Sequence, residues 1–517
     1  MTPALAPSLA LAVVYMIWAP PSADLAAQTF RTELFEAHGF EVWSNAWYAG
    51  HHLPGYSVLY PPLASLIGIR LVGAASAIAA ALLFAAIVRP RYGDRANLAI
   101  VLFGIGTATN LFTGRLTFAL GVALGLAAVL AAERRRPGVA GVLSALTSLA
   151  SPVAGLFAAF AGTVAWLTGR RRDGIALAVP ALAAIALMAL AFPTGGVEPF
   201  AGNTFKLITL AVVLVIVLAP PDERALRMGA LLYVGMCLAL FVFDTPIGGN
   251  ATRLGALFAA PLLALASAGR RRPLVIALAL VPLVYWQWVA PVRDLSDAVG
   301  EPSVEEAYYE PLLDEMDRIA PDAPFRVHVP ATRNRWESVY VAERYPLARG
   351  WMRQLESDDF DLFQDGNLTA PAYGEWLGDR GVAFVAISLA AEPDYLAEDE
   401  IELIHGRLPY LREVWSSDDW ELYEVENPVP LAEPGARLTA LAIDGFTIEA
   451  AVAGDHLVGV HYSPYWAVVA GDGCVEAQGD WTLVHTDAAG TIEVQAELSA
   501  GGLIRALPGG GDRTCSG

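Results

Sequence analysis

Charge is scarce in this chain of 517 residues: charged side chains make up 17% of it, against about 25% in a typical soluble protein. Lysine is almost missing, since Lys206 is the only one. Residues 1–295 contain 20 basic and 12 acidic side chains, which leaves 13 and 41 for the rest. An apolar, mildly basic part therefore precedes a strongly acidic part. Because an acidic surface repels phosphate, we expect no nucleic-acid partner.

Several sequence motifs are also missing. The chain has no glycine loop that cradles phosphate, no HExxH pair and no Cys/His set with zinc spacing, so soluble kinase, protease and nucleotide chemistry have no support. Only three cysteines occur. If the acidic part lies outside the cytoplasm, a disulfide between Cys474 and Cys515 is the favoured interpretation, and two free thiols are the alternative.

Apolar runs fill residues 1–295, and a helix needs about 20 apolar residues to cross a membrane. Arginine clusters divide these runs into intervals of about 30 to 45 residues, each broken near its middle by polar residues. Since arginine-rich loops stay cytoplasmic, each interval predicts one hairpin of two helices. The prediction is a multi-pass plasma membrane protein of about 11 transmembrane helices, with a cytoplasmic N-terminus. The clusters lie at residues 89–91, 134–136, 170–172, 224–227 and 270–272.

The longest predicted outer loop, residues 21–57, combines an acid, histidines and aromatic residues. Asp24 lies at its start, and His51 and His52 lie near its end. Such a set beside a membrane surface can form a polar site. The alternatives are helix N-capping for Asp24 and an interfacial aromatic belt.

Two arginines lie at predicted outer ends of spans, against the usual bias for the cytoplasmic side. They are Arg115 and Arg253, the latter near Asn250. A guanidinium binds phosphate with paired hydrogen bonds, so a phosphate site is one interpretation. Snorkelling of single arginines to the interface is the other.

Together, these features resemble the GT-C superfamily of integral membrane glycosyltransferases. Segments that carry a further likeness, to poorly characterised prokaryotic membrane proteins, are residues 47–51, 60–63, 151–152 and 249–253. The resemblance implies transfer of a sugar from a polyprenyl-phosphate donor to a cell-envelope glycan or protein, with Asp24 as general base. Under this hypothesis, His51, His52 and Tyr60 line the acceptor side, and Arg115, Asn250 and Arg253 contact substrate.

Many members of the superfamily have two adjacent acids at the matching position, whereas Ala23 and Leu25 flank Asp24 here. This departure disfavours metal binding by a carboxylate pair, and no cofactor is expected. It also leaves open a non-catalytic membrane scaffold or receptor with a glycan-binding outer domain. A transporter or flippase is the third alternative, disfavoured because few charges lie in mid-span.

The acidic part is predicted to lie outside the cytoplasm and to contain two regions. Residues 296–427 predict an α/β subdomain, with buried strands near residues 325–329, 382–387 and 420–425. Residues 428–517 alternate in the manner of a β-sandwich. Possible glycan contacts are Trp351 with Arg353, and Tyr465 with Trp466, although core aromatics at a strand end are the ordinary interpretation of the second pair.

Overall fold

The computed structural model describes residues 3–193, 195–221, 223–267, 273–356, 362–363, 366–511 and 514. The chain divides into two compact units, and each contains more than one stretch of chain. Unit 1 comprises Met1–Ala37, Tyr56–Met188 and Gly195–Val299, and unit 2 comprises His38–Gly55, Ala189–Thr194 and Gly300–Gly517. The first long loop of the sequence is therefore shared, because its middle belongs to unit 2.

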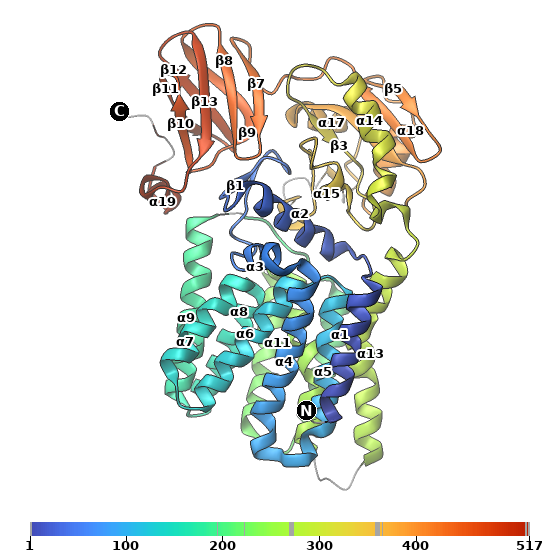
Figure 1. The fold of residues 1–517 in the computed structure, drawn as a ribbon, viewed down its shortest axis with the longest axis vertical. Coiled ribbons are helices and arrows are strands. Elements are labelled where there is room, and N and C mark those ends of the chain that lie inside the picture. The colour runs from blue at the N-terminus through green and yellow to red at the C-terminus, as the bar shows by residue number, and fades with distance from the viewer. Residues whose placement is uncertain are drawn as a thin grey trace. The chain divides into compact units, whose positions relative to one another are not determined.

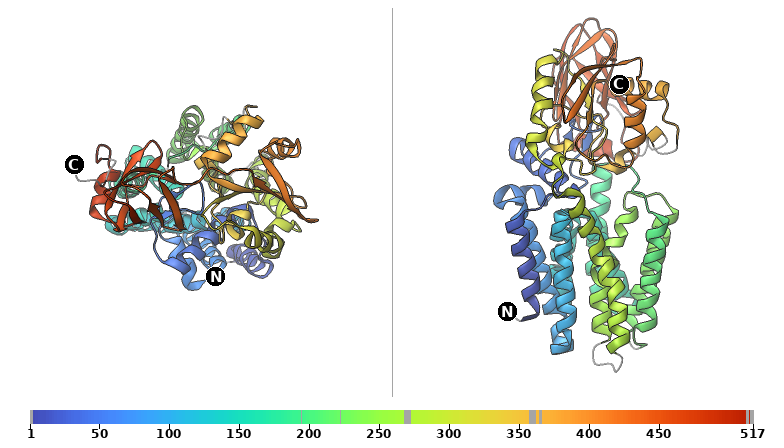
Figure 2. Two further views of the ribbon diagram at one scale, coloured as in Figure 1. Left: turned by 90° about the horizontal axis from the view of Figure 1, so that it is seen from above. Right: turned by 90° about the vertical axis from the view of Figure 1, so that its right-hand side faces the viewer.

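Unit 1 is a bundle of helices whose long members run alongside one another (Figures 1 and 2). Its core is packed from alanine, leucine and phenylalanine side chains of α4, α5, α6 and α12. The helices are α1 (Ala6–Trp18), α2 (Ala23–His38), α3 (Tyr60–Ile67), α4 (Ile69–Tyr92), α5 (Asn97–Phe112), α6 (Leu116–Glu133), α7 (Pro137–Ala150), α8 (Pro152–Leu167), α9 (Arg171–Ala191), α10 (Gly202–Leu218), α11 (Arg224–Val242), α12 (Thr252–Ala266) and α13 (Pro273–Ala298).

Within the described residues, five helical segments are long and apolar enough to cross a membrane, the first of them Ile69–Phe112. The number rises to six if α1 and α2, bent by 70° at their junction, are counted as one broken span. Many leucines on these helices are exposed, as expected of surfaces in contact with lipid. The chain is thus a multi-pass membrane protein, and the count of 11 spans stays a prediction.

The apolar run of residues 58–87, which is long for one span, is broken at Gly68. The φ of Gly68 is +93°, a backbone conformation that side chains with a Cβ rarely adopt. Gly68 separates the short helix α3 from α4, and the Tyr60 hydroxyl donates across the break to the Ile69 carbonyl at 2.7 Å.

Two ion pairs bring arginine-rich turns together in unit 1. Arg91, at the end of α4, pairs with Glu223, just before α11, at 3.1 Å. Arg170, just before α9, pairs with Glu133 at the end of α6. The arginine clusters at these turns therefore meet in neighbouring pairs, as an arrangement of hairpins requires.

Unit 2 contains a four-stranded sheet of order β3-β4-β6-β5, in which only β3 and β4 are parallel. Several helices and 3-10 turns accompany this sheet. The elements are η4 (Pro302–Val304), η5 (Glu306–Tyr308), α14 (Glu310–Ile319), β3 (Arg326–His328), α15 (Glu337–Tyr340), η6 (Arg353–Glu356), α17 (Ala370–Asp379), β4 (Val382–Ser388), α18 (Glu398–His405), β5 (Leu411–Ser416) and β6 (Trp420–Val425).

The last part of unit 2 contains two antiparallel sheets, of orders β10-β13-β8-β7 and β11-β12-β9. Their buried side chains alternate along the strands, as in Phe446 and Ile448 or Val458 and Val460. The domain boundary predicted at residue 427 and the β-sandwich stay predictions. The strands are β7 (Ala436–Ala442), β8 (Gly445–Ala450), β9 (Gly454–His461), β10 (Trp466–Ala470), β11 (Gly473–Gln478), β12 (Trp481–Thr486) and β13 (Gly490–Ala496), followed by α19 (Ala500–Ala506).

Candidate functional site

Asp24 and Arg115, which are 91 positions apart in the chain, form an ion pair in unit 1. Asp24 lies in the first turn of α2, and Arg115 lies in the turn between α5 and α6. The Arg115 Nε donates to Asp24 Oδ2 at 2.7 Å. The two side chains keep 29% and 22% of their surface exposed, so the pair remains accessible.

The glycine before Arg115 explains why this pair forms. The φ of Gly114 is +75°, and a Cβ there would lie 2.4 Å from the Leu25 nitrogen and 2.5 Å from Ser22 Oγ. The turn therefore lies directly against the first residues of α2. Only glycine permits both this backbone conformation and this approach. Local backbone chemistry thus brings the guanidinium of Arg115 to Asp24.

Arg253, in the first turn of α12, is a second cation close to this pair. Its guanidinium lies over the ring of Phe118, at 5.6 Å from the centroid. It is close enough to interact electrostatically with Arg115, Asp24 and Glu198. Within the described part of the chain, Arg253 forms no hydrogen bond or ion pair. Asn250, named with it from the sequence, lies in the preceding turn η3 (Gly248–Ala251).

A further carboxylate, not singled out in the sequence, joins the cluster. Asp294 of α13 is close enough to both Arg115 and Asp24 to interact electrostatically. Burial lowers the pKa of Arg115, but the carboxylates of Asp24 and Asp294 raise it more strongly, and the resulting shift is upward. Arg115 is therefore a permanent cation between two acids. The only sequence signal for Asp294 was a charge at the end of the last apolar run.

A cavity of about 960 Å³ opens beside the cluster, and both Arg115 and Arg253 line it. Most of its wall is apolar and comes from α10, α12 and α13. Several of these apolar side chains are also exposed, so the cavity is open at its side. The polar part of the wall comprises Thr109, Asn110, Thr113, Arg115, Thr204, Thr252, Arg253, Gln287 and Arg293.

Gln287 is the most buried polar side chain of this wall after Thr113, with 3% of its surface exposed. Its Nε2 donates weakly to the Leu257 carbonyl at 3.5 Å, and its Oε1 has no hydrogen-bond partner within the described residues. A Cβ at position 106 would lie 2.2 Å from Gln287 Nε2. Gly106 of α5 therefore makes room for this amide in the cavity wall.

The predicted acceptor residues are divided between the two units, with Tyr60 in unit 1 and both histidines in unit 2. Tyr60 is fully buried, and its hydroxyl is used at the break between α3 and α4. His51 and His52 form the strand β2 (His51–His52) of unit 2, paired with β1 (Trp43–Ser44). His51 stacks on Trp47 at 5.4 Å. The role of these residues in acceptor binding stays a prediction.

His52 is nearly buried in unit 2 and contacts two oxygens. Its Nδ1 lies 2.9 Å from the Pro193 carbonyl, and its Nε2 lies 3.2 Å from Ser463 Oγ. Burial lowers the pKa of His52 to about 4, although the Pro193 carbonyl raises it in part. The ring is therefore neutral at physiological pH.

Of the two predicted glycan patches, one is buried. Tyr465 and Trp466 are both 0% exposed, and Trp466 packs against Trp43 at 5.3 Å. This position is that of core aromatics at a strand end. Arg353 is partly exposed and pairs with Asp394, and Trp351 is half-buried. A glycan contact at Trp351 and Arg353 stays a prediction.

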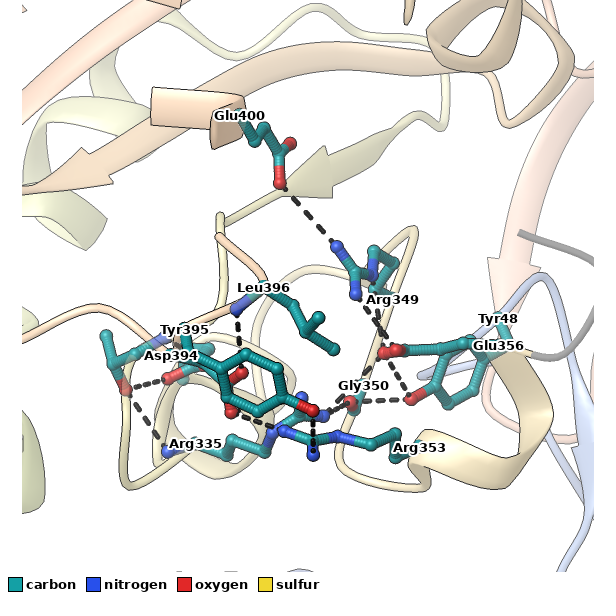
Figure 3. A network of polar contacts seen from close by, with 12 residues as sticks. Tyr48, Arg335, Arg349, Gly350, Arg353, Glu356, Asp394, Tyr395, Leu396 and Glu400 are labelled. Atoms are coloured by element: carbon teal, nitrogen blue, oxygen red, sulfur yellow. Dashed lines mark hydrogen bonds and ion pairs between the residues drawn. The ribbon is translucent and has the colours of Figure 1, made fainter. Parts of the chain in front are cut away.

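Arg353 belongs to a network of three arginines and three carboxylates in unit 2 (Figure 3). Arg349 pairs with Glu356 at 2.9 Å and with Glu400 at 3.6 Å. Arg335 lies 3.6 Å from Glu356 and 3.5 Å from Asp394. The Tyr48 hydroxyl, from the first long loop, donates to the Gly350 carbonyl at 2.6 Å. The network thus anchors that loop within unit 2.

No group of three His, Cys, Asp or Glu side chains able to hold a metal is found among the described residues. Cys237 is a free, buried thiol. The predicted pairing of Cys474 with Cys515 involves a residue outside the part of the chain that the structure describes.

No family model and no curated protein matches the chain. Among solved structures, the chain is similar to ArnT from Cupriavidus metallidurans bound to undecaprenyl phosphate, with 13% identity and a TM-score of 0.38, over 80% of this chain and 97% of that one. It is also similar to the apo oligosaccharyltransferase of Archaeoglobus fulgidus, with 11% identity and a TM-score of 0.44, over 76% and 72%.

A second structure of the archaeal enzyme, tethered to an acceptor peptide with the NVT sequon, matches at 11% identity and a TM-score of 0.40, over 71% of this chain and 65% of that one. All three structures are less than 25% identical to this chain. Since all three TM-scores lie below 0.5, we base its function on its own residues.

Proposed function

We propose that this protein transfers a sugar from a polyprenyl-phosphate donor to a cell-envelope glycan or protein at the outer face of the plasma membrane. One observation carries the proposal: the arginine bonded to Asp24 also lines an apolar cavity that a second arginine shares. An acid, two phosphate-binding cations and a hydrophobic wall are the parts that such a reaction needs.

The cavity supports a lipid-linked donor. Arg253 and Arg115 offer charged N–H groups for the phosphate at one end of the wall. Leucines of α10 and α13, such as Leu210 and Leu278, line the wall and are more than 60% exposed. Burial of isoprenoid carbon against such leucines is favourable by about 25 cal/mol per Å². A phosphate with a long hydrocarbon tail matches both ends of the cavity.

In the proposed reaction, an acceptor hydroxyl attacks the anomeric carbon of the sugar while Asp24 takes the hydroxyl proton. The bond between the anomeric carbon and the phosphate oxygen breaks, and the polyprenyl phosphate leaves with that electron pair. Arg115 and Arg253 stabilise the charge that grows on the departing phosphate. The step needs neither an oxidant nor a cofactor.

The proposed orientation places the arginine-rich turns in the cytoplasm and the Asp24 cluster outside. It is supported by the two ion pairs that join neighbouring arginine-rich turns, since such turns stay on the cytoplasmic side. The N-terminus is then cytoplasmic, and unit 2 faces away from the cytoplasm.

The test uses the full-length chain in nanodiscs with a panel of radiolabelled polyprenyl-phosphate monosaccharides and envelope glycan or peptide acceptors. We expect Asp24→Asn to reduce transfer by at least 100-fold, in the range lost with a general base. The matched control is Glu36→Gln, which neutralises an exposed acid on the same helix and is expected to leave transfer unchanged.

Retained transfer in Asp24→Asn would remove Asp24 from the chemistry. Absence of transfer by the unaltered protein with every donor, together with absence of polyprenyl-phosphate binding, would favour the scaffold or receptor alternative instead.

A further inference from the structure

Asp24 is engaged in the structure, because the hydrogen bond from Arg115 Nε occupies its Oδ2 at 2.7 Å. A general base must be free to receive the proton that it abstracts. This oxygen is therefore not available in its observed arrangement, and the Arg115 contact must loosen or shift before Asp24 acts through it.

The same guanidinium is exposed to the donor cavity. Arg115 lines the cavity, and of its five N–H donors only Nε–H is used, since its terminal nitrogens form no hydrogen bond within the described residues. A phosphate in the cavity can pair with these terminal nitrogens in the bidentate geometry that guanidinium groups favour. Asp24 and the phosphate thus compete for one cation.

Competition of this kind couples two binding events, and thermodynamic coupling is reciprocal. A phosphate that draws Arg115 toward the cavity weakens the bond to Asp24. Conversely, the charge of Asp24 weakens the attraction of Arg115 for phosphate. Arg253 is suited to receive the phosphate first, because no carboxylate of the described residues is bonded to it.

From this arrangement we infer that Arg115 is a latch that holds the carboxylate of Asp24 until a donor phosphate enters the cavity. The inference rests on the proposed function and adds a regulation of the same site. The Arg115 bond lowers the basicity of the Asp24 carboxylate, which reaches its full basicity only when a bound donor draws Arg115 away, so the enzyme does not expose an activated base to water or acceptor alone.

The test is the affinity of the full-length protein in nanodiscs for a polyprenyl monophosphate without sugar. We expect Asp24→Asn to bind it about two- to fivefold more tightly than the unaltered protein, as release from a partly exposed ion pair predicts. The matched control is Asp294→Asn, which removes a carboxylate that interacts with Arg115 without a hydrogen bond to it. We expect a smaller gain in this variant.

Asp24→Asn is also measured in the Arg115→Ala background, which completes a double-mutant cycle. The gain in affinity from Asp24→Asn should disappear in that background. Equal gains in Asp24→Asn and Asp294→Asn would indicate a general effect of charge and overturn the latch. An unchanged or weaker affinity in Asp24→Asn, or a gain that persists without Arg115, would overturn it too. Lack of binding by the unaltered protein would instead refute the proposed donor and the latch together.

Discussion

Unit 1 and unit 2 each contain a group of arginines and carboxylates, and the two groups differ in how completely their charges are paired. In unit 2, each of Arg335, Arg349 and Arg353 faces at least one carboxylate within 3.6 Å (Figure 3). In unit 1, Arg115 pairs with Asp24, but Arg253 forms no hydrogen bond or ion pair among the described residues and lies over the ring of Phe118. Arg115 and Arg253 also line a cavity.

The difference separates a structural network from a binding site. Buried charges are costly unless partners satisfy them, so the saturated network of unit 2 has little left to offer a ligand. An arginine that lines a cavity and has no carboxylate partner gains the most favourable interaction energy when an anion binds there. The two groups are therefore distinguished by whether each arginine has a carboxylate partner, and not by the number of arginines.

The largest effect is expected from breaking the network of unit 2. Burial raises the pKa of Glu356, but Arg349 and Arg335 lower it more strongly, so the pKa lies below its usual value. The side chain is therefore ionised between the two arginines. Glu356→Gln should remove the negative charge that pairs with two buried arginines and lower the local stability by about 3–5 kcal/mol. Hydrogen exchange of the amides of β3 and β4 measures this loss. Glu375→Gln, at an exposed acid of α17, is the control and should change nothing.

A second variant addresses the unpaired cation of unit 1. Arg253→Ala should weaken polyprenyl-phosphate binding by about 10- to 100-fold, which corresponds to loss of one or two hydrogen bonds to a charged group. Equilibrium binding in nanodiscs measures the change. Glu356→Gln, applied as the reference from unit 2, should leave the affinity unaltered. If both variants weaken binding equally, the distinction between the two groups is wrong.

A third change tests the backbone that builds the unit 1 pair. Gly114→Ala introduces a Cβ at a φ of +75° and within 2.5 Å of the start of α2. We expect a cost of about 1–3 kcal/mol and lower transfer activity, because α2 and Asp24 must move away. Thermal unfolding and the transfer assay report the two effects. Gly138→Ala, where a Cβ meets nothing within 4 Å, should be neutral or slightly stabilising.

The smallest effect concerns pH and lies in unit 2. Burial raises the pKa of Glu337 to about 7, and its hydrogen bonds from Thr332 reduce the rise only in part. The folded state therefore binds a proton that the unfolded state has lost, so stability falls as pH rises. Between pH 6 and 8 the loss from this group is about 1 kcal/mol. Burial and Asp444 raise the pKa of Glu41 to about 7 as well, in the same direction.

Hydrogen exchange of unit 2 at pH values between 6 and 8, corrected for intrinsic rates, measures this dependence. Glu337→Gln should flatten the profile by about half. His52 does not interfere, because burial lowers its pKa to about 4 and it is neutral throughout this range. A profile identical in both proteins would show that Glu337 is ionised in the folded state.

Regular elements with strong apolar patterns agree with the structure most closely. The predicted strands at residues 382–387 and 420–425 correspond to β4 and β6. The apolar and acidic residues of 303–320 have helical spacing, but α14 begins only at Glu310, because 3-10 turns occupy residues before it. The strand β5 was not predicted, since its side chains are half-buried or exposed and give little apolar contrast.

The candidate site was partly predictable. Asp24, Arg115 and Arg253 were singled out by residue type and by their position at span ends, and the structure brings them together. Asp294 was missed because it is 270 positions from Asp24, and no local pattern indicates which acid at a helix end faces another. The burial of Tyr465 and Trp466 depends on packing against distant strands, which an aromatic pattern does not reveal.

Hydropathy and charge along the chain determined where helices form and where arginine-rich turns lie, because transfer into lipid is decided residue by residue. Only the tertiary structure decided which charges are paired, since a bond such as that from Arg115 to Asp24 depends on the approach of two helices at Gly114. It also assigned the middle of the first long loop to unit 2, through contacts such as Tyr48 with Gly350. Composition places charge in a region, whereas packing decides whether that charge has a partner.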